Sequence, residues 1–264
     1  MTFMRSVQSN AERYARNLLY GSKLFFPLRR TYQRLFNPEK WQFWQGMMSF
    51  YAPLISPGDL VFDVGANMGT YSQVFLQMGA TVVAIEPNDD CSGSLLQLAR
   101  LAPRRMSIER VALGDRVGTA EFHVCDQTGL STMNDQWLEV AGRSKIYGGA
   151  KWVATRTVPV VTLDSLAEKY GVPSFIKIDV EGYEDHVLSG MSFLPRGIRF
   201  EFHSSMLNVA LNCLGILAEN YLFNYNVGET AHPELAEWLD VKAMRPVVSG
   251  LDCEFGDILA RRRE

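Results

Sequence analysis

The residues with the clearest chemical meaning combine a carboxylate with closely spaced glycines. Asp63 lies in the apolar run 60–64, and Gly65 and Gly69 follow it directly. Glycine lets the backbone turn with positive φ and approach a ligand closely. A strand, a glycine loop and a helix in this order form a nucleotide-sized crevice at the carboxyl end of an α/β sheet. The sequence therefore predicts a ligand-binding crevice after residue 64.

The charge of Asp63 indicates which ligand this crevice holds. A carboxylate there would repel a pyrophosphate, and the glycines do not follow the G-x-G-x-x-G spacing of dinucleotide-binding loops. It suits a cationic ligand such as S-adenosylmethionine, which carries a sulfonium and an ammonium group. Glu86 ends the next apolar run, 21 residues after Gly65, where a carboxylate can accept both hydroxyls of a ribose. Glu86 also fits a nicotinamide cofactor, so the glycine loop makes the distinction.

A second group of ionisable residues follows two later apolar runs. Lys177, Asp179 and Glu181 share one parity, and so do Glu201 and His203. Central parallel strands are normally apolar on both faces, and a buried charge is costly unless it is paired or solvated. We therefore expect these groups to project into the crevice as catalytic residues. The structural alternative makes Asp179 a helix N-cap and Lys177 its ion-pair partner.

The expected catalytic step is removal of a proton from a hydroxyl by a general base. Asp179 or Glu181 is the predicted proton acceptor, His203 is a competing candidate, and Lys177 would order the carboxylates. Asp179, Glu181, Glu201 and His203 could together hold a divalent ion. Their spacing does not demand one, so we predict no metal. The remaining histidines have no ligand spacing and are expected to be surface or packing residues: His123, His186 and His232.

The elements around these residues follow the alternation of a parallel α/β sheet with helices on both faces. The seven expected strands are 60–64, 81–85, 107–112, 175–179, 198–203, 222–227 and 255–260. The expected helices are 70–78, a segment ending near 102, 162–170, 183–188 and 207–219. Segments 119–125 and 152–160 read as an inserted antiparallel pair. The polar loop 126–151 between them is long enough to be a functional lid.

Composition and charge narrow the class of protein. The chain has 264 residues and a formal net charge of −3, so nucleic acid is not an expected partner. Residues 1–50 hold 8 basic and 2 acidic residues and many aromatic ones. We predict a helical extension over 1–55 and one domain over 56–264 with an insertion at about 116–160. The extension is expected to pack on this domain or on a second subunit, as in a homo-oligomer. Peripheral membrane contact is less favoured because Pro27 and Pro53 interrupt the helical pattern.

The cysteines and the apolar runs indicate the compartment. Cys91, Cys125, Cys213 and Cys253 are widely spaced and form no paired motif, which predicts reduced thiols in a cytoplasmic protein. No signal-peptide core is evident near the start, and no apolar run reaches the ~20 residues that span a bilayer.

Four segments taken in order resemble the FkbM family of S-adenosylmethionine-dependent methyltransferases. They are residues 62–69 (FDVGANMG), 84–87 (AIEP), 158–164 (VPVVTLD) and 176–184 (IKIDVEGYE). Residues 129–133 resemble the family's glycine-and-serine loop more weakly. The resemblance runs from about 58 to 203. It implies a class I, Rossmann-like methyltransferase fold and O-methylation of a hydroxyl on a small molecule, a sugar or glycan, or a natural product.

The resemblance also implies a cofactor site. Asp63, Gly65, Asn67 and Gly69 would line the methionine end of S-adenosylmethionine, Glu86 would hold its ribose, and Val111 and Ala112 would lie near its adenine. The same site is assigned the neighbouring residues Ala66, Thr70, Pro87 and Asp179. Two other functions remain open at this point, a nicotinamide-dependent oxidoreductase and a non-catalytic cofactor-binding scaffold.

Overall fold

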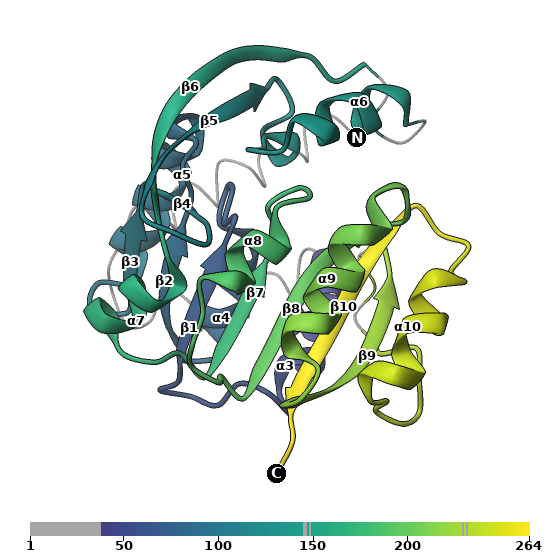
Figure 1. Cartoon of the computed structure of the whole chain (residues 1–264). Helices are drawn as coiled ribbons and strands as arrows, with labels where there is room; N and C mark the ends of the chain where they lie inside the picture. The colour runs from purple at the N-terminus through teal and green to yellow at the C-terminus, as the bar shows by residue number, and fades with distance from the viewer. Residues whose placement is uncertain (1–37, 145–146, 148, 229, 231) are drawn as a thin grey trace.

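A seven-stranded sheet forms the centre of the fold (Figure 1). The computed structural model describes residues 38–144, 147, 149–228, 230 and 232–264. The strand order is β3-β2-β1-β7-β8-β10-β9. All neighbours are parallel except β10, which is antiparallel to both β8 and β9. The strands are β1 (Leu60–Val64), β2 (Thr81–Ile85), β3 (Met106–Glu109), β7 (Phe175–Ile178), β8 (Gly197–His203), β9 (Tyr221–Val227) and β10 (Phe255–Arg262). This is the predicted mostly parallel, Rossmann-like class I methyltransferase sheet.

The order of the strands locates the ligand crevice. From β1 the chain moves outward through β2 and β3, and it later returns to β7 on the other side of β1. Ligands of open α/β sheets bind outside the carboxyl ends of the strands at such a switch point. The crevice is therefore expected above the ends of β1, β2 and β7.

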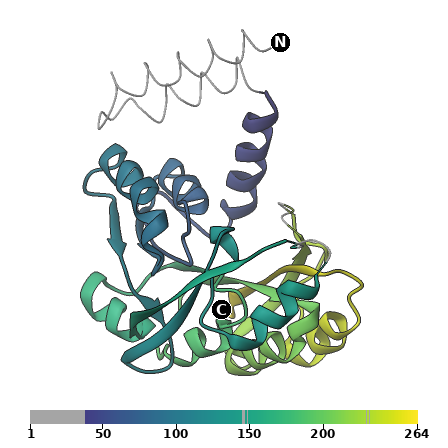
Figure 2. The ribbon, with the colours of Figure 1, turned by 90° about the horizontal axis from the view of Figure 1, so that it is seen from above.

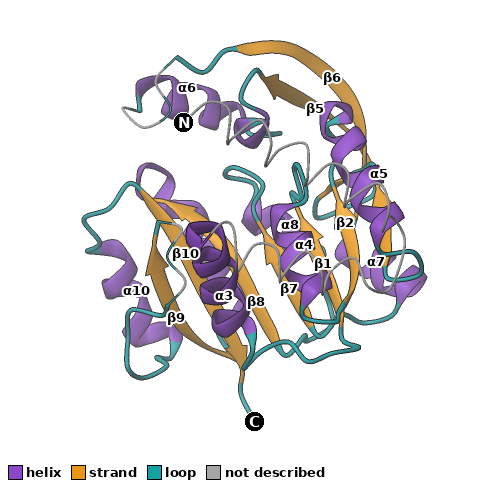
Figure 3. Ribbon diagram, turned by 180° about the vertical axis from the view of Figure 1, so that it is seen from behind, coloured by secondary structure: helices purple, strands orange, loops and turns teal. Residues whose placement is uncertain are grey.

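Helices cover both faces of the sheet, as the sequence predicts (Figure 3). One face carries α3 (Pro38–Tyr51), α4 (Thr70–Gln77) and α5 (Ser92–Leu101). The other carries α7 (Leu163–Tyr170), α8 (Glu184–Ser189), α9 (Leu207–Leu217) and α10 (Val241–Ser249). Side chains alternate along a strand, so Val61 and Phe175 join the first cluster, whereas Phe62 and Ile176 join the second.

A smaller sheet and a helix lie above the carboxyl ends of the main strands (Figure 2). The sheet has the order β4-β6-β5, and β5 runs antiparallel to β6. Its strands are β4 (Ala112–Leu113), β5 (Gly118–Cys125) and β6 (Trp152–Val161), and the helix is α6 (Asp135–Arg143). We call the described part of residues 118–161 the cap. It confirms the predicted antiparallel insertion.

Three elements differ from the sequence prediction. The expected strand 107–112 is divided, because β3 joins the main sheet and β4 pairs with β6 instead. The expected loop 126–151 contains α6, whose N-cap Asn134 accepts from Gln136 N and which buries Trp137 completely. The third, α10, is not predicted, because it contains Pro246, a residue that normally breaks a helix. Short 3₁₀ helices complete the description: η1 (Asp89–Cys91), η2 (Thr128–Leu130) and η3 (Ser204–Met206).

The described part of the amino-terminal extension belongs to the core. Helix α3 is described from Pro38 to Tyr51, and the Tyr51 ring packs edge-on against Phe75 and Phe175 at centroid distances of 5.0 and 5.4 Å. Most of the basic, aromatic stretch, together with the predictions of subunit packing or membrane contact, lies outside the described residues. No helix within the described ranges is long and apolar enough to cross a membrane. All four cysteines are described and are free thiols, as predicted.

Candidate active site

The turn after β1 requires glycine for a steric reason. Gly65 has φ +72°, and a Cβ placed on it would lie 1.7 Å from the carbonyl oxygen of Asp179. Asn67 and Gly69 also have positive φ, at 47° and 83°. The ends of β1 and β7 can therefore meet only because position 65 has no side chain.

Glu86, at the end of β2, is held in place by the same loop. Its two oxygens accept hydrogen bonds from Asn67 N and Asn88 N, both at 2.8 Å. Burial raises the pKa of Glu86 to about 7, against the lowering effect of these two donors. The carboxylate is thus positioned before any ligand arrives, which fits the predicted ribose contact.

A cavity of about 410 Å³ lies between the ends of β1, β2 and β7 and the cap. Most predicted site residues line it. From the predicted cofactor site these are Gly65, Ala66, Asn67, Thr70, Glu86, Pro87, Val111, Ala112 and Asp179. From the predicted catalytic set they are Lys177, Asp179, Glu181 and Glu201.

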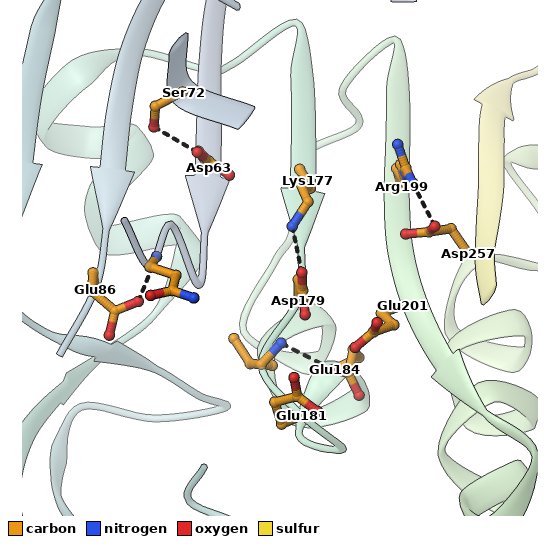
Figure 4. A network of polar contacts seen from close by, with 12 residues as sticks. Asp63, Ser72, Glu86, Lys177, Asp179, Glu181, Glu184, Arg199, Glu201 and Asp257 are labelled. Atoms are coloured by element: carbon orange, nitrogen blue, oxygen red, sulfur yellow. Dashed lines mark hydrogen bonds and ion pairs between the residues drawn. The ribbon is translucent and has the colours of Figure 1, made fainter. Parts of the chain in front are cut away.

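Asp63 and Gly69 do not line this cavity, and the prediction for Asp63 needs correction. Asp63 is fully buried, and its Oδ2 accepts from Ser72 Oγ at 2.5 Å (Figure 4). Alternation along β1 turns it toward α4 rather than toward the ligand. Burial raises its pKa, opposed by Lys177 and Ser72. The cavity is nevertheless acidic, because its wall carries Glu86, Asp179, Glu181 and Glu201.

Lys177 is bonded to one of the predicted carboxylates, Asp179. Its Nζ donates to Asp179 Oδ2 at 2.7 Å and lies 4.2 Å from the centroid of the Tyr71 ring. Burial would raise the pKa of Asp179, but the charge of Lys177 holds it below its usual value. Burial would likewise lower the pKa of Lys177, but Asp179 and Asp63 hold it above its usual value. Both groups are charged.

The N-cap alternative for Asp179 is wrong. Helix α8 begins at Glu184, its N-cap position is Tyr183, and that side chain makes no capping bond. Glu184 itself accepts from Val180 N and Gly182 N at 3.1 and 3.2 Å, and this satisfies the loop. Asp179 is therefore free of a capping role.

Glu181, Glu201 and His203 form a compact cluster beside Asp179 (Figure 4 shows the carboxylates). His203 Nε2 lies 3.1 Å from Glu201 Oε2 and 3.4 Å from Glu181 Oε2. The imidazole ring is buried against Trp137 of the cap at a centroid distance of 4.2 Å, and it is not part of the cavity wall. The two strand ends therefore meet as predicted, but His203 supports the carboxylates from behind.

Burial and mutual repulsion perturb this cluster. Burial raises the pKa of Glu181 to about 7. Burial, together with Asp179 and Glu181, raises the pKa of Glu201 well above its usual value. Burial alone would lower the pKa of His203, but the nearby Glu201 and Glu181 outweigh the effect of burial and raise this pKa to about 11. Strongly perturbed groups in a cavity are typical of functional sites.

The sequence predicted a lid at 126–151, but not the contacts that the cap makes or the aromatic residues of the cavity wall. Thr128 Oγ1 donates to Asn67 Oδ1 at 2.9 Å, and Thr132 Oγ1 donates to Glu181 O at 2.9 Å. These bonds tie the cap to both sides of the cavity. The signals for them in the sequence were the length of the loop 126–151 and the weak resemblance over 129–133. Four aromatic residues of the cavity wall were not predicted from the sequence: Tyr71, Phe122, Tyr147 and Phe255.

The other three histidines lie outside the cavity wall, as predicted. His123 Nε2 pairs with Asp135 Oδ1 at 2.8 Å on the cap. His186 stacks on Tyr183 at a centroid distance of 4.3 Å, and His232 lies 3.7 Å from Glu234.

Among curated proteins, the chain is similar to the hexuronic acid methyltransferase AglP of Haloferax volcanii. The two are 27% identical over 153 residues, which is 56% of this chain and 57% of AglP. The chain thus spans little more than half the length of this relative.

Solved structures with a similar arrangement share little sequence with the chain. A precorrin-6y C5,15-methyltransferase from Geobacter metallireducens GS-15 is 10% identical, with a TM-score of 0.43 over 83% of this chain and 87% of that one. An rRNA methylase from Streptococcus thermophilus is 8% identical, with a TM-score of 0.42 over 82% and 93%.

The family model of the methyltransferase FkbM domain matches residues 63–248, which include every predicted cofactor and catalytic residue. A match over more than half of the chain favours methyl transfer over hydride transfer and leaves the non-catalytic scaffold open. It also agrees with the resemblance in the glycine loop and the β7–α8 segment. The chain belongs to the FkbM methyltransferase family.

Proposed function

We propose that this protein is an S-adenosylmethionine-dependent O-methyltransferase that acts on a hydroxyl of a sugar or glycan. The observation that carries the proposal is a single cavity with two unlike walls. One wall is the turn after β1 with Glu86, and the other is the charged group Lys177, Asp179, Glu181 and Glu201. The similarity to a hexuronic acid methyltransferase supports a sugar as the acceptor.

The first wall fits the cofactor. Gly65, Ala66 and Asn67 line the cavity, and Glu86 is already oriented by Asn67 N and Asn88 N. Glu86 would hold the ribose hydroxyls, and Val111 and Ala112 would border the adenine. When bound, S-adenosylmethionine supplies an electrophilic methyl group on a cationic sulfur.

The second wall fits the acceptor hydroxyl. Methyl transfer is a direct displacement in which oxygen, methyl carbon and sulfur must be aligned, so orientation is the main contribution of the protein. An alcohol also needs a base within hydrogen-bond reach. Asp179 and Glu181 both line the cavity, and Lys177 fixes Asp179 by its 2.7 Å bond. His203 is the weaker candidate, because its Nε2 faces Glu201 and Glu181 rather than the cavity.

Two measurements test this function. Calorimetry with S-adenosylhomocysteine and with NAD should give binding to the first alone. Transfer of labelled methyl from S-adenosylmethionine to a panel of neutral and uronic-acid glycans should then identify a methylated sugar hydroxyl. A chain that binds no S-adenosylhomocysteine would refute the proposal, and a chain that binds it without methylating any acceptor would point to a scaffold.

A further inference from the structure

We infer that Glu181, Glu201 and His203 form a binding site for a divalent metal ion at the acceptor side of the cavity. The spacing of these residues along the chain does not demand a metal, so none was predicted from the sequence. The structure brings the three residues together from the β7–α8 loop and the end of β8.

The geometry of the donor atoms fits a single ion. One ligand atom from each residue can be chosen so that all three lie within 4.8 Å of one another. Ligands about 2.0–2.6 Å from a metal lie no more than about 5 Å apart across it. Two carboxylate oxygens and one imidazole nitrogen suit a first-row divalent ion such as Mn²⁺. A small adjustment of the side chains would complete the coordination.

An unsatisfied atom inside the cluster gives independent support. Glu181 is only 7% exposed, yet its Oε2 is buried without a hydrogen-bond partner. This oxygen points toward His203 Nε2, 3.4 Å away. A buried carboxylate oxygen without a donor is costly. A bound cation would satisfy it.

The charge balance of the wall points the same way. Four carboxylates line the cavity, and Lys177 is the one Lys or Arg among the described residues of the wall. Its ammonium is already bonded to Asp179. Glu181 and Glu201 are therefore left with His203 as their cationic partner, and a divalent ion bound at His203 Nε2 would take the place of the proton that makes it cationic. Buried charges are normally paired or coordinate metals.

The metal would act on the acceptor, and this part of the inference rests on the proposed function. An ion at this position would fix the two glutamates of the wall from behind and offset repulsion between the acidic wall and an acidic sugar. With Glu181 committed to the ion, Asp179 is the carboxylate left to take the hydroxyl proton. The metal site itself can be tested without methyl transfer.

The direct test is a titration of the full chain with MnCl₂ after treatment with a chelator and desalting. The electron paramagnetic resonance signal of free Mn²⁺ falls as the ion binds. We expect one site. Glu181→Gln, Glu201→Gln and His203→Gln should each weaken binding by about tenfold or more. The matched control is His123→Gln, because His123 also pairs with a carboxylate but lies outside the cavity.

A second measurement avoids dependence on how the variants fold. Pulsed spectroscopy of the wild-type complex should show coupling of Mn²⁺ to an imidazole nitrogen, and His203→Gln, with folding checked by its thermal melt, should abolish it. Lack of Mn²⁺ binding by the wild-type chain, or a bound ion without nitrogen coupling, would overturn the inference. Methyl transfer that continues in EDTA alongside either result would leave the proposed function standing. Metal binding without any methyl transfer would support the metal site and contradict the proposed function.

Discussion

The two walls of the cavity are built in opposite ways. On the β1–β2 wall, formed by 65–68, Thr70 and Glu86, both oxygens of Glu86 are satisfied by backbone N–H donors. On the β7–β8 wall, formed by Lys177, Asp179, Glu181 and Glu201, ionisable side chains face one another, and Glu181 Oε2 has no hydrogen-bond partner. One wall is complete by itself, and the other is incomplete until something binds.

This difference indicates a division of labour. A wall whose hydrogen bonds are already satisfied recognises the shape of a ligand. A wall of perturbed charges has the groups that move protons or bind ions. We therefore expect substitutions on the first wall to change cofactor affinity or stability and those on the second to change turnover.

The largest expected effect is on the β7–β8 wall. Asp179→Asn should lower kcat by about 10²- to 10⁴-fold, because an amide cannot take the hydroxyl proton. Affinity for S-adenosylhomocysteine, measured by calorimetry, should stay within about threefold. Glu181→Gln should act in the same direction, and the exposed Asp252→Asn serves as the control. Wild-type turnover in both variants would mean that this wall is not the catalytic one.

The next effect belongs to the β1–β2 wall. Gly65→Ala places a Cβ 1.7 Å from a backbone oxygen at a position with φ +72°, so no side-chain rotation relieves the clash. The free energy of unfolding should fall by about 3 kcal/mol or more, and cofactor binding should weaken with it. Urea denaturation measures the first and calorimetry the second. Gly93→Ala is the matched control, because a Cβ there meets no atom within 4 Å. Equal stability of the two variants would contradict the close approach of β1 and β7.

A smaller effect separates affinity from turnover. Glu86→Gln keeps the size of the side chain but turns an amide NH₂ toward one of the two backbone donors. Affinity for S-adenosylhomocysteine should fall by about tenfold, since a hydrogen bond to a charged group contributes about 1.5–3 kcal/mol. Turnover at saturating cofactor should change little, and the exposed Glu121→Gln should change neither quantity. A loss confined to kcat would mean that Glu86 takes part in turnover rather than in cofactor binding.

The smallest effect tests the corrected position of Asp63. Ser72→Ala removes the 2.5 Å bond to a buried carboxylate and should cost about 1 kcal/mol of stability. Cofactor affinity should be unaffected, because neither residue lines the cavity. Thermal denaturation and calorimetry measure the two quantities, with the exposed Ser49→Ala as control. A tenfold loss of affinity would show that Asp63 faces the ligand after all.

The sequence predicted the alternating core of this protein well, because periodicity and glycine positions reflect local physics. Strands 60–64 and 81–85 have the predicted bounds, and Gly65 and Glu86 lie where the spacing places them. The prediction failed where local preference and tertiary contact disagree. Helix α10 forms around Pro246, and α6 forms from a polar segment because Trp137 is buried in the core cluster beneath that helix.

By itself the sequence determined the sheet, the glycine turn and the set of ionisable residues, since each depends on residue type and short-range spacing. Only the tertiary structure decided which of those residues share a space. It turned Asp63 inward toward Ser72 and brought His203 within 3.4 Å of Glu181, although 22 positions separate the last two in the chain. The reason is physical: strand alternation and sheet register fix the direction of a side chain, and register is set by contacts between segments that are distant in sequence.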